Sequence, residues 1–311
     1  MHEEKYPYPT IDVTDWKVER QETIGGDEKY WLNHPGSGQQ WLFKPNNAHV
    51  NRVTGQSWTQ REDIAEKAAG EIAKIFGIPC ADIEFATWQG KAGCISRNLR
   101  PEGWELQTGL VLLSGMLNDY IPGSEISNKA RTGHSLKNIS DSLSAFAKPG
   151  NSALPNEFDA FDTFVGYLTF DALVANRDRH DENWAVMRPL RGGEGTLAGS
   201  FDHARALGST LREDAMQREL EQGVERWATK GTAWRFEHDR TEGPVTLVEL
   251  ARQSLRMVKP DVRAWWLRRA EAATPDAVAR VTNRIPKVSY VAGTFINEVY
   301  TVNRRRVLDD C

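Results

Sequence analysis

A strongly apolar segment that is followed at once by a run of charges constrains the fold of this 311-residue chain more than any other feature. Within residues 158–175 the apolar side chains recur at helical spacing. These positions are Phe161, Phe164, Val165, Leu168, Ala172 and Ala175. Directly after them, residues 176–183 read N-R-D-R-H-D-E-N. The pattern predicts a helix followed either by a solvated loop or by a site that gathers carboxylate and amide oxygens around a metal and a phosphate.

The bulk composition is that of an ordinary soluble globular protein, with 40% hydrophobic and 26% charged residues. The net charge is -4, so nothing in the overall charge favours direct nucleic-acid binding. The three cysteines are widely spaced and form no metal-binding motif, which favours a reducing compartment. No run approaches about 18 apolar residues, and the first residues do not resemble a signal peptide. We therefore expect a cytoplasmic protein without a membrane span.

The N-terminal third of the chain reads as a small antiparallel sheet with one helix. Short β-prone runs between turn residues predict the strands. Apolar residues that share one face predict a helix over residues 60–76, and Gly77 then ends it. The predicted strands are residues 18–24, 29–32, 39–44, 81–88 and 92–96.

The remainder of the chain is predicted to be mainly helical. A leucine stripe predicts a helix over residues 105–118, and several helices follow residue 212. Residues 119–157 are rich in Ser, Asn, Gly and Pro, which predicts a long and mobile loop. A small hairpin is expected from strands at residues 183–187 and 196–202.

Three oxygen-bearing side chains follow the apolar segment at suggestive spacing. Asn183 opens the first strand of the expected hairpin and Asp202 ends the second, so antiparallel pairing would bring them side by side. Mg²⁺ prefers hard oxygen ligands, of which the protein supplies few and phosphates and water supply the rest. Asn183 and Asp202 fit that preference, and Asp178 would remain free to accept a proton from an attacking hydroxyl.

The N-terminal sheet offers groups of complementary charge. Lys44 lies at the end of an apolar strand, where its amine can reach phosphate oxygens. A helical carboxylate, either Glu66 or Glu62, could hold it in place. Gly25 and Gly26 lie between two strands, where backbone amides can approach a phosphate closely. No G-x-x-x-x-G-K-[ST] motif is present, which excludes a P-loop enzyme.

A catalytic Asp with an Asn five residues later, then a hairpin leading to a metal-binding Asp, is the arrangement of protein kinases. The sequence D-R-H-D-E-N at residues 178–183 is similar to the D-R-H-x-x-N loop of phosphatidylinositol 3/4-kinases. It resembles still more the C-terminal domain of HipA-like serine/threonine kinases, in their compact form, over roughly residues 20–210. The other matching stretches are W-L-F-K (41–44), E-K-A-A-G-E-I-A-K-I-F-G-I-P (66–79) and F-D-H-A-R-A-L-G (201–208).

This resemblance implies an α+β, bilobal protein-kinase-like fold. Residues 1–100 would form an N-lobe with a small antiparallel sheet and one helix, on the phosphate side of ATP. Residues 101–311 would form a mainly helical C-lobe that carries the catalytic loop and the metal site. Together the two lobes would make one kinase domain.

The resemblance also implies a role for each matching residue. Asp178 is the expected catalytic base, and Asn183 and Asp202 are the expected Mg²⁺ ligands. Lys44 is expected to contact the α- and β-phosphates of ATP and to pair with Glu66. Glu66 is preferred over other helical acids because it stands eleven residues before the helix-ending glycine.

Other positions of the site follow the family pattern less closely. His180 belongs to the catalytic motif and is expected to orient its loop. The glycine loop with Gly25 and Gly26 is short and lacks G-x-G-x-x-G, so the way in which it holds the γ-phosphate stays open, with Lys29 as one candidate. The second metal motif reads D-H-A and not D-F-G, so control by a flipping Phe is not expected.

The leading interpretation is an ATP-dependent serine/threonine protein kinase that uses Mg²⁺. Two alternatives stay open: a lipid or small-molecule kinase of the phosphoinositide-kinase type, and a nucleotide-binding pseudokinase. The resemblance further implies a protein substrate, with a translation component such as an aminoacyl-tRNA synthetase as one candidate. A separate antitoxin or regulator chain is the expected partner, with neither nucleic acid nor membrane bound directly.

Overall fold

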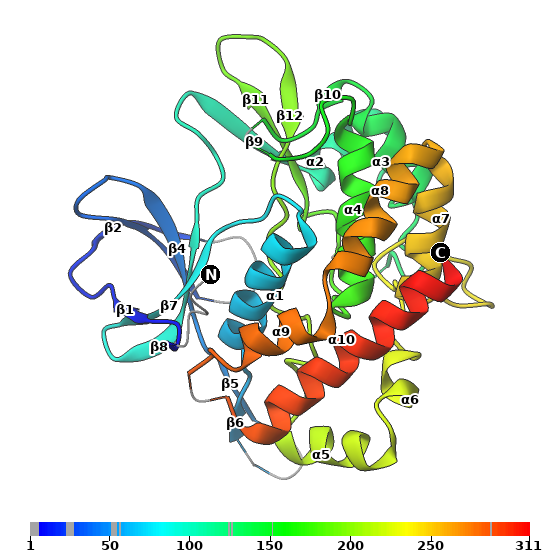
Figure 1. Ribbon diagram of the computed structural model, residues 1–311. Helices are drawn as coiled ribbons and strands as arrows, with labels where there is room; N and C mark the ends of the chain where they lie inside the picture. Colours follow the sequence, from blue (N-terminus) through cyan, green and yellow to red (C-terminus); the bar gives the residue numbers. More distant parts are fainter. Residues whose placement is uncertain are drawn as a thin grey trace.

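The computed structural model describes most of the chain and shows a mixed α and β fold. A sheet-rich N-terminal part lies beside a larger, mainly helical part (Figure 1). The expected phosphate-binding residues Gly25 and Gly26 lie outside the described residues. The structure describes residues 6–22, 28–50, 55, 57–123, 125, 127–150, 152–286 and 288–311.

A six-stranded sheet dominates the N-terminal part and confirms the five predicted strands. Its order is β1-β7-β8-β4-β3-β2, and neighbouring strands are antiparallel except for β1, which runs parallel to β7. The wholly antiparallel sheet expected from the sequence is therefore wrong at this edge. The strands are β1 (Thr10–Asp12), β2 (Lys17–Glu22), β3 (Lys29–Asn33), β4 (Gln40–Pro45), β7 (Ile83–Trp88) and β8 (Lys91–Arg97), and a separate ribbon pairs β5 (Ala48–Val50) with β6 (Ser57–Thr59).

Helix α1 (Glu62–Phe76) packs against strands β7 and β8, as its amphipathic pattern predicts. On its apolar face, Ile72 and Phe76 are fully buried. Gly77 ends the helix in the left-handed conformation, with φ 95°, which glycine adopts without a Cβ clash. Because α1 is packed against the sheet, the positions of its acidic side chains relative to the strands are fixed.

The predicted helix over residues 105–118 is only half correct. Residues Trp104–Thr108 form strand β9, and helix α2 covers Gly109–Met116. Strand β9 pairs antiparallel with β11 (Ala185–Pro189), so that Ala185 lies opposite Thr108 and Pro189 lies opposite Trp104. The leucine spacing fits a helix locally, but pairing with the distant strand β11 gives the backbone of Trp104–Thr108 its hydrogen-bond partners.

The predicted loop over residues 119–157 contains regular structure. Helix α3 (Leu136–Leu143) and the short strand β10 (Phe146–Ala147) lie within it. The Ser135 hydroxyl accepts a hydrogen bond from the backbone N–H of Asn138 and caps α3. Ile139 and Leu143 are buried and, with Leu136, stand at helical spacing, but the Ser, Asn, Gly and Pro residues around them concealed this signal in the sequence.

The predicted hairpin exists, but its strands are shorter than expected. Strand β11 pairs with β12 (Gly195–Leu197), and Val186 lies opposite Leu197. Continuing that register places Asn183 opposite Ser200. The expected pairing of Asn183 with Asp202 is therefore wrong, because both residues lie beyond the strands and the register is offset by two.

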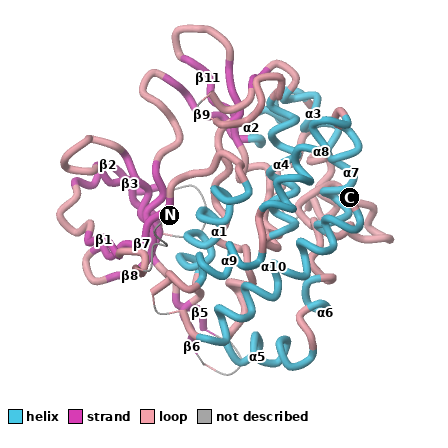
Figure 2. The backbone as a smooth tube through the Cα atoms, viewed as in Figure 1, coloured by secondary structure: helices cyan, strands magenta, loops and turns pink. Residues whose placement is uncertain are grey.

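Helix α4 (Ala160–Leu173) is the predicted core helix, and every one of its residues is buried. Asp159 and Asp162 form a capping box at its start. Helices α7, α8 and α10 contact it, and α10 runs along the helical part past α9 (Figures 1 and 2). In the described part of the chain, no helix has the length and hydropathy that crossing a bilayer requires. The remaining helices are α5 (Glu213–Gln222), α6 (Glu225–Ala228), α7 (Leu247–Met257), α8 (Pro260–Ala272), α9 (Pro275–Thr282) and α10 (Tyr290–Asp310).

The contact between α4 and α8 depends on a glycine and leads to a stability prediction. A Cβ on Gly166 would lie 2.2 Å from the ring of Trp266, which is fully buried and donates its indole N–H to the carbonyl of Asp162. We expect Gly166→Ala to lower the free energy of unfolding by about 3 kcal/mol, because the packed ring cannot move aside. Urea denaturation measures this change.

Gly115→Ala is the matched control, because a Cβ on Gly115 in α2 meets nothing within 4 Å. A helical alanine replaces a helical glycine in both variants, so only the clash differs between them. We expect the control to be neutral or slightly stabilising. Equal stability of the two variants would contradict the described packing of Trp266.

Candidate active site

Three charged side chains from distant parts of the chain meet at one point. The Nζ of Lys44, on strand β4, donates to Oε1 of Glu66 at 2.7 Å and to Oδ1 of Asp202 at 3.0 Å. Glu66 comes from helix α1, and Asp202 follows strand β12. The ion pair expected between Lys44 and Glu66 is thus present, and the site joins the sheet to the helical part.

Alternation along β4 directs the lysine toward α1. Phe43 points into a buried aromatic and aliphatic cluster of the sheet, so its neighbour Lys44 points to the opposite face. Glu66 is almost fully buried, and its second oxygen, Oε2, accepts the backbone N–H of His203 at 3.0 Å. One carboxylate therefore holds both the lysine and the segment that carries Asp202.

The charges of this cluster stabilise one another. Burial disfavours the charged form of Lys44, but Asp202 and Glu66 outweigh this effect and raise the pKa of the amine. Burial likewise disfavours ionised Asp202, yet Lys44 and Lys29 outweigh it and lower the pKa of that carboxyl. Both groups are charged at neutral pH. Asp202 also has a φ of 59°, a left-handed conformation that Asp tolerates better than most residues.

Arg179 anchors the loop that follows α4 and was missed by the sequence analysis. Its guanidinium is 2% exposed and donates through Nε and Nη2 to both oxygens of Asp171, at 2.7 and 2.8 Å. Its other contacts reach Ser200 Oγ at 2.9 Å, the carbonyls of Asn183 and Phe201 at 2.7 and 3.5 Å, and Nε2 of His203 at 3.3 Å. This one side chain therefore fixes the loop against the segment that leads to Asp202.

Asn183 and Asp178 are joined within that loop. The Nδ2 of Asn183 donates to the backbone carbonyl of Asp178 at 2.8 Å. The backbone N–H of Asp178 in turn donates to the side chain of Asn176 at 3.3 Å. Because the amide nitrogen of Asn183 is engaged, its amide oxygen is the atom left for another ligand.

The carboxylate of Asp178 has a partner that the sequence analysis did not foresee. Arg235 donates from Nε to Oδ1 of Asp178 at 2.7 Å, and its Nη2 lies 2.6 Å from the same oxygen. The two residues stand 57 positions apart in the sequence, so no local spacing predicts that they form a pair. Each side chain is about one-fifth exposed, at 21% for Asp178 and 20% for Arg235.

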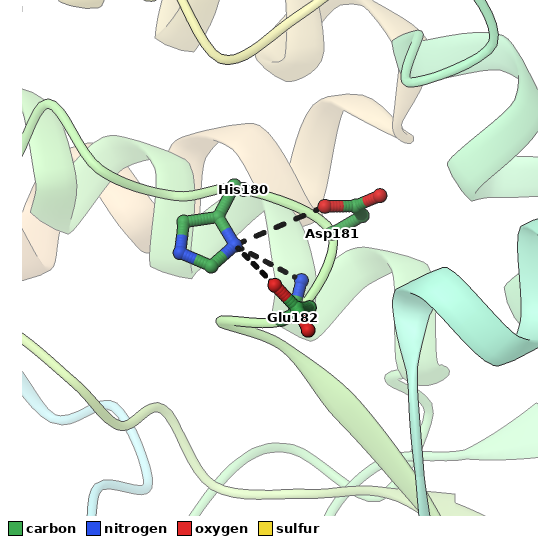
Figure 3. A group of neighbouring side chains, drawn as sticks. All are labelled: His180, Asp181 and Glu182. Carbon is green, nitrogen blue, oxygen red and sulfur yellow. Dashed lines mark hydrogen bonds and ion pairs between the residues drawn. The ribbon is translucent and has the colours of Figure 1, made fainter. Parts of the chain in front are cut away.

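His180 contacts the next two residues of the loop, Asp181 and Glu182, as Figure 3 shows. Its Nδ1 accepts the backbone N–H of Glu182 at 3.2 Å, which leaves the proton on Nε2. Burial lowers the pKa of this imidazole, so the ring is neutral. The neighbouring Asp181 accepts from Tyr120 Oη at 2.8 Å and from the backbone of Gly123 at 3.0 Å.

The side chains of His180, Asp181 and Glu182 lie close enough together to suggest a metal site of their own. Their candidate ligand atoms are within 4.8 Å of one another. However, the lone pair that His180 Nδ1 would give to a metal already accepts a hydrogen bond. We therefore assign this group to support of the loop and not to metal binding.

The structure thus brings the predicted residues into two groups. Lys44 contacts Glu66 and Asp202 in the first, and Asn183 contacts Asp178 in the second. Arg179 links the groups through the backbone on either side. Their catalytic and metal-binding roles stay predictions. The residues that sequence reasoning missed are Asp171, Arg179, Arg235 and His203 in its backbone role.

Sequence comparison alone places this chain in no group, because no protein-family model matches it and no curated protein matches it. Solved structures do match. The proinflammatory kinase CtkA of Helicobacter pylori superimposes with a TM-score of 0.70 over 97% of this chain and 96% of CtkA, at 17% identity. HipA of Shewanella oneidensis, solved in a toxin–antitoxin complex with HipB and operator DNA, gives a TM-score of 0.54 at 13% identity. The chain has the fold of a HipA-like kinase.

The coverage of the two structures agrees with the expected compact form of the HipA-like fold. The match spans 97% of this chain in both cases, but it takes in 96% of CtkA and 70% of HipA. Identities of 17% and 13% establish the HipA-like fold and leave activity to be argued from the site.

Proposed function

We propose that this chain is a Mg²⁺- and ATP-dependent phosphotransferase that phosphorylates serine or threonine residues of a protein. The HipA-like fold supports a kinase-like function in general terms. The observation that carries the proposal is the contact of Lys44 with both Glu66 and Asp202, next to a loop in which Asn183 is bonded to Asp178. Buried charged groups that perturb one another's pKa values concentrate at functional sites, which favours a functional reading of this cluster.

Lys44 would bind phosphate oxygens of the nucleotide. Glu66 holds its amine in place, and Asp202 and Glu66 together raise its pKa, so the positive charge is present before the nucleotide binds. The side chain of Lys44 is still 15% exposed, which leaves one face for a ligand. Its bond to Asp202 would be exchanged for a phosphate when both phosphate and metal are present.

The donor set of the site suits a hard divalent cation. Asp202 supplies an ionised carboxylate with 27% of its side chain exposed, and Asn183 supplies an amide oxygen whose companion nitrogen is engaged. Two protein oxygens match the preference of Mg²⁺ for few protein ligands beside phosphates and water. When bound, the ion would neutralise charge on the phosphates and orient them.

Asp178 would accept the proton of the attacking hydroxyl. Two hydrogen bonds fix its loop: Arg179 donates to the carbonyl of Asn183, and the Asn183 amide donates to the carbonyl of Asp178. Most of the rate enhancement would then come from positioning and electrostatic stabilisation, without a covalent intermediate.

The proposal extends to the substrate and to a partner. We propose a protein substrate in the cytoplasm in preference to a lipid, because the loop at residues 178–183 resembles HipA-like serine/threonine kinases more than phosphatidylinositol kinases, and CtkA and HipA, which match this chain, both have the HipA-like fold. The HipA structure contains HipB, which supports a separate antitoxin or regulator chain as a partner here too. Gly25, Gly26 and Lys29 stay candidates for contact with the phosphates.

The test is transfer of labelled γ-phosphate from ATP to an acceptor protein, with and without Mg²⁺. We expect transfer to stop when Mg²⁺ is chelated, and Asp202→Asn to lower it by about 100-fold or more, because the metal loses its charged ligand. Asp309→Asn, at the exposed end of α10, is the matched control and should transfer normally.

The rival interpretations give different results in the same experiment. Labelled lipid in place of labelled protein would favour a lipid kinase. Nucleotide-dependent melting without any transfer would indicate a pseudokinase. Full transfer by Asp202→Asn would contradict the proposed metal site.

A further inference from the structure

Arg235 contacts the proposed base in an unusual manner. Both Nε and Nη2 of its guanidinium approach the same oxygen of Asp178, Oδ1, at 2.7 and 2.6 Å. An arginine fork more often spans the two oxygens of a carboxylate. Among the described residues, no donor contacts the other oxygen, Oδ2. One oxygen of Asp178 is therefore fixed while its partner is left for another group.

The side chain of Arg235 is itself held from one side. Its guanidinium carbon lies 3.9 Å from the ring centroid of Trp234, within cation–π distance. Arg131 lies over the same ring at 5.0 Å, so two cations share one aromatic surface. Burial and the nearby charge of Arg235 lower the pKa of Arg131. The negative charges of Asp181, near Arg131, and of Asp178, paired with Arg235, offset this crowding of positive charge.

The backbone at Arg235 is fixed by a buried imidazole. Trp184 donates its indole N–H to Nε2 of His134 at 3.1 Å, and indole can only donate. His134 must therefore carry its proton on Nδ1, which donates to the carbonyl of Arg235 at 2.8 Å. Trp184 comes directly after Asn183, so the proposed catalytic loop itself reaches the segment that carries Arg235.

Backbone hydrogen bonds continue this contact on both sides of the arginine. The N–H of Glu237 donates to the carbonyl of His134 at 2.9 Å, and the N–H of His238 donates to the carbonyl of Ala130 at 3.0 Å. The ring of His134 also stacks on Phe236 at 4.6 Å. These four contacts fix the backbone around Arg235, which favours a defined role for its ion pair with Asp178.

We propose that Arg235 is a positioning residue for phosphoryl transfer: it holds Asp178 by Oδ1 so that Oδ2 faces the hydroxyl of the substrate. This role rests on the proposed function, because it presumes that Asp178 is the base. The acceptor hydroxyl would donate its proton to Oδ2 while its oxygen bonds to the γ-phosphorus, and the bond from that phosphorus to the bridging oxygen would break, so that ADP leaves. Arg235 would balance the negative charge of the carboxylate before transfer without moving a proton itself.

The experiment measures γ-phosphate transfer to myelin basic protein, used as the probe acceptor, with full-length variants. We expect Arg235→Ala to lower kcat by about 100-fold, because a misplaced base loses much of its effect. The dissociation constant of Mg-ATP and the melting temperature should stay close to wild type. Arg235→Lys should keep only part of the activity, since an ammonium cannot reproduce the fork.

Arg177→Ala is the matched control. It removes an exposed arginine that directly precedes Asp178 and whose one hydrogen bond to the described residues is a 3.5 Å contact with the Thr232 hydroxyl. Normal transfer by this variant shows that loss of positive charge near the loop is not sufficient. Added guanidinium should restore part of the activity of Arg235→Ala and none of the activity of Asp178→Ala.

A double-mutant cycle separates the two proposals. If Arg235 acts through Asp178, Arg235→Ala has no further effect when Asp178→Ala is already present. Multiplied effects, or an Arg235→Ala variant with wild-type kcat, would overturn the positioning role while leaving the kinase proposal intact. Wild-type transfer by Asp178→Ala would instead overturn the kinase proposal itself.

Discussion

Asp178→Ala is expected to lower γ-phosphate transfer by about 10²- to 10⁴-fold, the range that a positioned general base contributes. The binding of Mg-ATP should change little, because Lys44 contacts both Glu66 and Asp202 without the help of Asp178. Single-turnover transfer and nucleotide titration, measured on the same preparation, separate the two effects.

Asp178→Asn tests the charge of that residue alone. The amide has nearly the shape of the carboxylate but cannot accept the proton, so its activity should be as low as that of the alanine variant. Removal of an exposed acid, in Asp309→Ala, should leave transfer unchanged. Unaltered transfer by both Asp178 variants would remove this residue from the mechanism.

Asp171→Ala is expected to have the largest effect on stability. The Asp171 carboxylate is 1% exposed and accepts both donors of Arg179, together with the Nδ2 of Asn176 at 2.8 Å. Without it, a buried guanidinium keeps its charge and loses its counter-ion, which costs about 3–5 kcal/mol. Chemical denaturation of the variant and of wild type measures the loss.

Asp171→Asn is the matched variant for this prediction. It keeps an oxygen for the guanidinium but not the charge, so we expect a smaller loss of stability than for alanine. Phosphate transfer should fall in both variants, because Arg179 also fixes the carbonyls of Asn183 and Phe201. A stability of Asp171→Ala within 1 kcal/mol of wild type would contradict the buried ion pair, since such pairs cost about 3 kcal/mol or more to break.

Local patterns predicted the elements whose neighbours in sequence determine them. Helix α1 and its end at Gly77 follow from apolar periodicity and from the special backbone freedom of glycine. Helix α4 follows in the same way, and the contact of Lys44 with Glu66 follows from the resemblance to HipA-like kinases. These predictions held because each depends on short-range spacing or on a motif that spans a few residues.

Long-range pairing was where sequence reasoning failed. Strand β9 looks helical until β11 is placed beside it, and β1 has no local signal at all. Helix α3 is different, because Leu136, Ile139 and Leu143 do stand at helical spacing and were concealed by the Ser- and Asn-rich residues around them. For the two strands, the free energy that decides the structure comes from a partner segment far away in the chain.

The sequence by itself determined which residues of the candidate site carry charge or a ligand oxygen, because these are properties of the side chains themselves. The residues are Lys44, Asp178, Asn183 and Asp202. Only the tertiary structure decided what holds them. The carboxylate of Asp171 lies eight residues from Arg179, and Arg235 lies 57 residues from Asp178. Hydrogen bonds and charge attraction act over a few ångströms in space, whatever the separation along the chain, so these supports appear only once the chain is folded.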